Sequence, residues 1–176
     1  MSKLTKEELS KQLDEVTQEL ISWLHNQKDD RFSEQKDEKW STGQNVAHLI
    51  ISTKELNKGM GIVKMVLKAM FGTNNRTERS YSEVIEKYNA KLEEGFKAKG
   101  KFVPEPVSNG QKNRLVKDLE EELKKLQKHL SKWDEEDLSV YLLPHPVLGK
   151  LTIREMMYFT IHHTQHHFSN IKKYYT

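Results

Sequence analysis

The stretch HPVLGKLTIREMMYFTIHHTQHHFSNIKK, residues 145–173, decides how the rest of the chain is interpreted. It opens with a turn that contains proline and glycine. A Thr-Ile-Arg-Glu sequence typical of a helix start follows, and the pattern then continues without a helix breaker. Four of the chain's eight histidines fall on two successive turns of this helix. Such a cluster suggests a metal site, a proton-handling site, a pH-sensitive surface or chance.

Helical periodicity separates the four histidines into two unlike pairs. An α-helix advances about 100° per residue, so its faces can be read from the sequence. His163 and His167 lie on one shoulder of the apolar face, and we expect them to turn towards the interior. His162 and His166 lie about 100° further round, so we expect them to face solvent or a neighbouring loop. The apolar face itself consists of Ile153, Met157, Thr164, Phe168, Ile171 and Tyr175.

The inner pair has the spacing of metal ligands. Two imidazoles four residues apart on a helix can bind one ion, as in the H-x-x-x-H pattern of zinc hydrolases. The bland alternative for either residue is a hydrogen-bonded core histidine, because a buried imidazole without a partner is costly. The chain contains no cysteine. Any transition metal would therefore be held by histidine, carboxylate or water.

Two ligands make a weak site, so a third is expected from elsewhere. His48 is the best candidate, because it lies in the middle of the otherwise apolar segment NVAHLI. Its position points away from the face formed by Val46, Leu49, Ile50 and Thr53, so periodicity supports it less well. His145, between two prolines, is a loop ligand or a substrate contact. His25 and His129 lie near helix ends and receive no functional role.

The remaining sequence is helical nearly throughout. Capping-box patterns mark helix starts at Thr5, Ser41 and Thr152, with Ser80 as a fourth candidate. Apolar residues at three- and four-residue steps predict helices over 5–24 and 111–133, and a shorter one over 81–96. Four long helices plus minor ones, with no βαβ alternation, predict an all-α protein with one four-helix-bundle domain over residues 1–176.

Three stretches interrupt this pattern. Residues 99–110 contain two prolines and two glycines, which predicts a long, exposed crossover loop. Residues 141–152 predict an ordered turn or a short hairpin before the last helix. The apolar stretch 59–72 is ambiguous: a core helix, a lid over a pocket or a dimer face is favoured over a helix on a membrane surface.

Composition excludes several classes of protein. Charged residues make up 31% and hydrophobic residues 35% of the 176-residue chain, and the net charge is only +3. Its lysines are interleaved with glutamates, so nucleic-acid binding is not indicated. No run reaches the roughly 20 apolar residues of a membrane span, and the polar N-terminus does not look like a signal peptide. We therefore expect a cytoplasmic protein without stable membrane insertion.

Two motifs together resemble a known family. The segment KWSTGQNVAHLI, residues 39–50, is similar to the tryptophan–helix–histidine signature of the DinB/YfiT-like superfamily of small four-helix metalloproteins. The opening stretch resembles that family's C-terminal signature, in which a His-Pro…Gly-x-Leu-Thr turn leads into a helix with H-x-x-x-H. The two motifs and the helix order match most of the chain in outline, whereas residues 59–112 do not match.

The resemblance implies a specific site and topology. The metal triad would be His48 with His163 and His167, and the bundle would be up-down-down-up. His166, next to the last ligand, would lie beside the ion without binding it, and we also expect Trp40 and His145 close to the site. Family members suggest zinc, nickel or a similar divalent ion, and some are S-transferases or isomerases that use a low-molecular-weight thiol. Others carry only a hydrolase label.

The chemistry at such an ion stays open at this stage. A divalent ion can activate either water or a thiol, which gives a hydrolase or a thiol transferase acting on a small molecule. Glu55 is the one candidate base, although a surface salt bridge explains it better. Basic side chains for an anionic thiol are available at Lys64, Lys68, Arg76 and Arg79. The alternative is a non-catalytic metal- or ligand-binding bundle, acting as a homodimeric interaction or stress-response protein.

Overall fold

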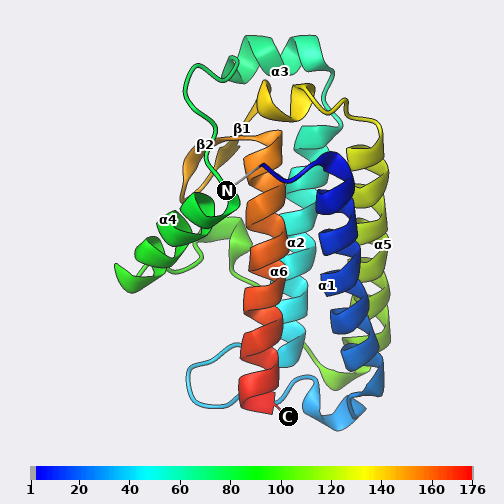
Figure 1. The fold of residues 1–176 in the computed structure, drawn as a ribbon. Coiled ribbons are helices and arrows are strands. Elements are labelled where there is room, and N and C mark those ends of the chain that lie inside the picture. Colours follow the sequence, from blue (N-terminus) through cyan, green and yellow to red (C-terminus); the bar gives the residue numbers. More distant parts are fainter. Residues whose placement is uncertain (1–2, 176) are drawn as a thin grey trace.

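Four long helices form the body of the protein in the computed structural model, which describes residues 3–175. They are α1 (Lys6–Asn26), α2 (Thr42–Met60), α5 (Lys112–Ser131) and α6 (Ile153–Tyr175). Helices α1 and α6 run in one direction, and α2 and α5 run in the other (Figure 1). The predicted up-down-down-up bundle is therefore confirmed.

Capping interactions fix the start of the helices that the sequence marked. Thr5, Ser41 and Ser80 each accept a hydrogen bond from a backbone N–H three residues on, and the residue at that position bonds back. Thr152 and Glu155 make the same reciprocal pair at the start of α6. These bonds satisfy amide groups that a helix leaves unpaired in its first turn.

The core consists of the apolar stripes that face the centre of the bundle. The leucine stripe of α5 is almost completely buried, as are the stripes of α1 and α6. Helix α2 is buried on several sides, which explains why its sequence shows no clean amphipathic pattern. Burial of these stripes holds the four helices together and fixes their rotation about their own axes.

A long crossover joins the parallel helices α2 and α5. It contains α3 (Lys64–Phe71), α4 (Tyr81–Glu93) and two 3₁₀ turns, η2 (Gly100–Phe102) and η3 (Asn109–Gln111). Helix α3 lies across one end of the bundle and α4 packs beside α6 (Figure 1). The expectation of an exposed loop over 99–110 is only partly right. Pro104 is buried, and η2 packs against α2.

A short hairpin leads into α6. Strands β1 (Leu142–His145) and β2 (Gly149–Thr152) pair antiparallel, with Leu142 opposite Thr152. Gly149 has φ +76, a left-handed conformation that a residue with a side chain adopts only at a cost. Two further 3₁₀ turns, η1 (Asp29–Arg31) and η4 (Asp137–Ser139), complete the described elements. Of the two options for 141–152, the hairpin is the correct one.

The ambiguous stretch 59–72 divides into the end of α2 and the separate helix α3. Only Leu67 of α3 is buried, so a core helix is the wrong interpretation. The α3 helix lies at the end of the bundle away from the C-terminus of α6 (Figure 1). It therefore does not cover the histidines in the second half of α6, and the lid and dimer-face interpretations of this stretch stay predictions. Among residues 3–175, no helix combines the length and apolarity that crossing a membrane requires.

Candidate metal centre

Three histidines from two helices meet inside the bundle. His48 comes from the first half of α2, and His163 and His167 come from adjacent turns of α6. The Nε2 atoms of His48 and His163 are 3.1 Å apart, and those of His163 and His167 are also 3.1 Å apart. These three residues form the one group of histidine and acidic side chains in the described chain that has metal-binding spacing. The structure thus brings together the three predicted residues, whose binding of an ion stays a prediction.

The tautomer of His48 follows from its partner in the crossover. Its Nδ1 lies 2.7 Å from the carbonyl oxygen of Phe102. A carbonyl oxygen only accepts, so Nδ1 carries the proton and Nε2 keeps its lone pair. His48 points away from the apolar face of α2, as periodicity indicated. It is buried all the same, because η2 and α6 cover it.

The tautomer of His167 is fixed in the same way by Asn45. His167 Nδ1 lies 2.7 Å from Asn45 Oδ1. The amide of Asn45 cannot be reversed, because its Nδ2 donates to the carbonyls of Trp40 and Ser41 at 3.0 and 2.9 Å. The Asn45 oxygen therefore accepts from Nδ1–H, and His167 Nε2 also presents a lone pair.

These two tautomers make the cluster a good fit for a cation. A neutral His163 could donate from Nε2 to only one of its two neighbours, so at least one 3.1 Å contact would bring two lone pairs together. A divalent ion would accept all three lone pairs. Nitrogen ligands about 2.1 Å from one ion lie about 3.0–3.4 Å apart, depending on the coordination geometry. The spacing and the donor set therefore both suit an ion held by three imidazoles.

Burial keeps the three imidazoles neutral. It lowers the pKa of His163 and His167 well below the usual value, and neighbouring imidazoles add to this effect. Burial also lowers the pKa of His48, although the bond to the Phe102 carbonyl opposes the shift. Metal ligands must be unprotonated to bind. The site is therefore prepared for an ion at neutral pH.

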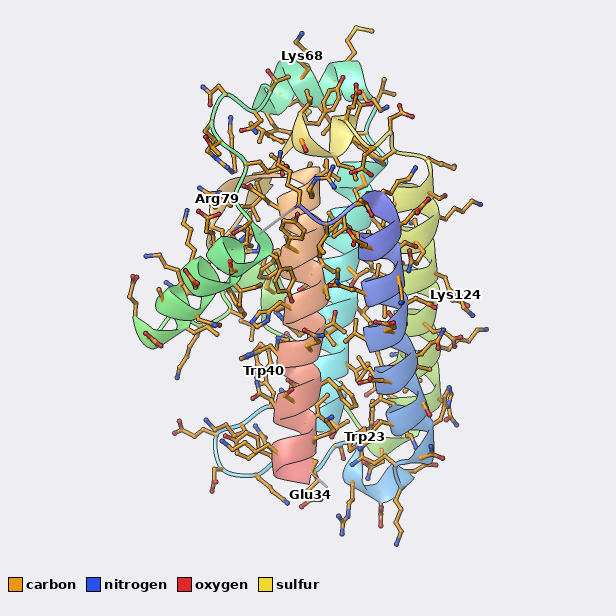
Figure 2. The ribbon with its side chains drawn as sticks, in the orientation of Figure 1. Trp23, Glu34, Trp40, Lys68, Arg79 and Lys124 are labelled. Atoms are coloured by element: carbon orange, nitrogen blue, oxygen red, sulfur yellow. The ribbon has the colours of Figure 1, made fainter. Side chains whose placement is uncertain are left out.

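Aromatic rings surround the cluster. Trp40 lies parallel to His167 at a centroid distance of 6.1 Å and tilts over His48 at 5.0 Å. Phe159 stacks on His163 at 4.8 Å, and Tyr88 of α4 meets His163 edge-on at 6.2 Å. Figure 2 shows Trp40 beside the second half of α6. Trp40 thus lies against two members of the histidine cluster.

Glu55 is a poor candidate for the base. Its carboxylate is held by Lys58 and Lys101 at 2.7 and 2.6 Å. Hydrogen bonds from Lys101 and then Lys58 lower its pKa, so it is a weaker base than a free glutamate. It also lies outside the group with metal-binding spacing. The salt-bridge interpretation fits Glu55 better than a catalytic one.

His145 lies near the centre, but a tight turn uses its Nδ1. That atom accepts from the backbone N–H groups of Val147 and Leu148, at 3.2 and 3.1 Å. Its ring packs edge-on against Phe159, at 4.2 Å between centroids, and Phe159 in turn covers His163. Burial lowers the pKa of His145 to about 4. Its Nδ1 is therefore not free to bind an ion, and a substrate contact, the other sequence option, stays a prediction.

The outer pair was expected to face solvent or a neighbouring loop, but a helix covers it instead. His162 and His166 are half-buried against Tyr88, because α4 packs over this side of α6. His166 Nε2 lies 3.1 Å from the Asn170 amide nitrogen, a group that can only donate. His162 Nε2 is buried without a hydrogen-bond partner among the described residues. Periodicity excluded this pair from the inner face, but it could not show that another helix covers them.

The basic residues suggested for an anionic thiol lie elsewhere. Arg76 and Arg79 bind Glu155 in the first turn of α6, where the Arg76 Nη1 contact measures 2.7 Å. Glu155 precedes His163 by eight residues, which is about 12 Å along the helix. Lys64 binds Asp134 at 3.0 Å, at the end of the bundle where α3 lies. The arginines thus clamp the crossover to α6.

Three contributors to the site escaped the sequence interpretation. Asn45 lies three residues before His48 on α2, so a search for polar residues at helical spacing would have found it. The Phe102 carbonyl and the Tyr88 ring come from the crossover, whose position relative to α2 and α6 depends on long-range packing. No local pattern signals such a contact.

The fold and the histidine cluster together define a class of protein. It is an up-down-down-up helical bundle with three histidines from its second and last long helices at metal-binding spacing. The family model of the DinB superfamily matches residues 12–171, and the chain belongs to that superfamily. Among the curated proteins and the solved structures, no match to the chain was found.

Proposed function

We propose that the protein is a metal-dependent S-transferase that joins a low-molecular-weight thiol to an electrophilic small molecule. The site would hold zinc, nickel or a similar divalent ion between His48, His163 and His167. One observation carries this proposal. Two of the three imidazoles are locked with their Nε2 lone pairs turned to the same place, and no fourth residue of the described chain joins the group.

Three protein ligands leave coordination positions for an exogenous ligand. A divalent ion bound here would lower the pKa of a thiol or a water in such a position. The protein's own part is to keep the imidazoles unprotonated by burial and to orient them through the Phe102 carbonyl and Asn45. The rings of Trp40, Tyr88 and Phe159 exclude bulk water around the ligands.

Thiol transfer is favoured over hydrolysis by the absence of a suitable carboxylate. A hydrolase commonly uses a carboxylate near its nucleophilic water as a general base. Glu55 is occupied by two lysines, and the described part of the chain brings no other acidic side chain into the histidine group. A metal-bound thiol loses its proton without a strong base. We place this activity in the cytoplasm, where thiols are kept reduced.

The test begins with metal analysis of the purified protein and of its chelated form. Candidate low-molecular-weight thiols are then incubated with electrophiles, and the loss of free thiol is followed with and without metal. We expect one equivalent of metal and metal-dependent thiol consumption that His167→Ala removes. Ester or amide hydrolysis without thiol consumption would favour the hydrolase. A chelation-induced fall in melting temperature, with neither reaction, would favour a non-catalytic metal-binding bundle.

A further inference from the structure

An apolar patch lies at the end of the bundle away from the metal centre. Val63, Met65, Val66 and Met70, in and just before α3, are 66%, 77%, 47% and 58% exposed. Val140, 39% exposed, lies near them, since its carbonyl accepts from the N–H of Asn74 just after α3. These residues, here called the α3 patch, are five of the six large hydrophobic side chains that are exposed among residues 3–175. Such clustering marks an interaction site, whereas scattered apolar residues do not.

The patch is built on a firmly attached helix. Leu67 anchors the inner side of α3 and is fully buried. Lys64 Nζ binds Asp134 at 3.0 Å and also binds Asp137. At the other end of α3, Lys150 Nζ donates to the Phe71 carbonyl at 2.8 Å. The exposed side chains therefore sit on a fixed surface and do not belong to a frayed segment.

The patch does not serve the metal centre. Met60, the last residue of α2 before the turn into α3, lies twelve positions after His48. At 1.5 Å per residue this is about 18 Å along the bundle. Figure 1 shows α3 crossing the end of the bundle opposite the C-terminus. A function for this patch would therefore involve a partner from outside the chain.

The charges around the patch favour a second copy of this chain. Lys68 is exposed on the outer side of α3 (Figure 2), while Asp134 and Glu136 are exposed in the acidic run that flanks the helix. In a two-fold interface the same patch of each copy contacts the other. Such a patch must therefore be complementary to itself, with an apolar centre and rim charges of both signs. An anionic membrane would gain little here, because Lys64 is already bound to Asp134 and Asp137, which leaves Lys68 as the one exposed cation of α3.

We propose that the α3 patch is the contact surface of a homodimer with two-fold symmetry. The two α3 helices pack against each other through Met65, Val66 and Met70, and Lys68 of each copy lies near acidic residues of the other. Stable interfaces involve roughly 20–30 residues a side, and this patch is smaller. The dimer is therefore weak and depends on protein concentration. It does not depend on the proposed enzymatic function.

Sedimentation of the full-length protein over a concentration series provides the first test. Met65→Asp should weaken dimerisation at least tenfold, because it places a charge in the apolar centre of the interface. Val103→Asp is the matched control, since Val103 is 46% exposed but lies in the crossover, outside the patch. Melting curves verify that both variants fold. A chain that is monomeric at every concentration would overturn the proposal, and so would a dimer that survives Met65→Asp.

The absence of native cysteine allows a second test. A two-fold interface centred on α3 places residue 65 near its own copy. Mild oxidation should therefore cross-link Met65→Cys into dimers at concentrations where Val103→Cys stays monomeric. Cosedimentation with phosphatidylserine vesicles tests the membrane alternative. Equal cross-linking of both variants would show that α3 does not mediate a homodimer, and vesicle binding that Met65→Asp abolishes, without selective cross-linking of Met65→Cys, would assign the patch to a membrane instead.

Discussion

The same two turns of α6 carry two histidine pairs with the same spacing and different environments. In the inner pair, His167 donates a hydrogen bond from Nδ1–H to Asn45 Oδ1, which leaves the Nε2 lone pair free to bind an ion. In the outer pair, His166 uses Nε2 to accept from the Asn170 amide, so the atom best placed to bind an ion is already occupied. The partner of each imidazole therefore distinguishes a candidate ligand from a packed histidine, and the spacing alone does not.

Burial also separates the two pairs. His163 and His167 are 5% and 7% exposed and lie against His48 from another helix. His162 and His166 lie against Tyr88, which supplies a ring face and no imidazole or carboxylate. Only the inner pair is joined by a histidine from a second helix, so an ion bound there would link α2 to α6. We therefore expect metal removal to loosen the packing of α2 against α6 at the inner pair and to leave the surroundings of the outer pair unchanged.

The largest effect is expected from His163→Ala. Its Nε2 lies 3.1 Å from both other Nε2 atoms, so its loss removes the shared member of the group. We expect the metal affinity to fall more than about 100-fold. This loss exceeds the fall that typically follows removal of a residue that hydrogen-bonds to a metal ligand. Competition with a chromophoric chelator measures this, and circular dichroism verifies the fold. An affinity that stays within tenfold of wild type would remove His163 from the site.

Asn45→Ala should have the next largest effect. Without the Asn45 oxygen, His167 can rotate or place its proton on Nε2. Such residues behind metal ligands typically contribute about 10–100-fold to affinity. Asn170→Ala is the matched control, because Asn170 contacts a histidine of the outer pair in the same helix. Equal losses for Asn45→Ala and Asn170→Ala would contradict the distinction between the pairs.

His145 represents a third environment and leads to a prediction about pH. Burial lowers its pKa to about 4 in the folded protein, whereas the usual value is 6.5. The unfolded chain therefore binds a proton that the folded chain does not, and stability is lost as the pH falls below 6.5. From pH 7 to pH 5 this residue alone should remove about 2 kcal/mol from the free energy of unfolding.

The measurement compares His145→Asn with wild type by urea unfolding at pH 7 and pH 5, both without metal. Asparagine keeps an oxygen acceptor for the Val147 and Leu148 amides but does not titrate. Its stability should fall by about 2 kcal/mol less than that of wild type over this range. Identical pH dependence in the two proteins would mean that His145 is not buried as a neutral imidazole.

Local sequence patterns predicted what depends on one helix at a time. Capping boxes and apolar stripes gave the four long helices, and a 100° rotation per residue separated His163 from His162. The pairing of His48 with α6 came from a family resemblance, since periodicity on α2 pointed His48 away from the main apolar face. Contacts between distant segments were out of reach. The Phe102 carbonyl lies 54 residues from His48 along the chain, in a crossover without periodicity.

The outer side of α6 also shows that periodicity along one helix does not predict contacts with distant segments. A single helix indicates which face is less apolar, but it does not indicate whether another helix covers that face. Helix α4 does so through Tyr88, which turns a predicted solvent-facing pair into a half-buried one. Burial lowers the pKa of both His162 and His166, so these histidines are poorer pH sensors near neutrality than exposed ones. The idea of a pH-sensitive surface is thereby weakened.

The smallest effect is expected from His162→Ala. Its Nε2 is buried without a hydrogen-bond partner in the described chain, and it lies one residue from a candidate ligand on the wrong face of the helix. We expect the metal affinity to change less than about twofold, well below the effect of losing a group behind a ligand. The same chelator competition compares it directly with His163→Ala. Since the two substitutions remove identical side chains from adjacent positions, similar losses in affinity would show that the face assignment is wrong and that the outer pair also contacts the ion.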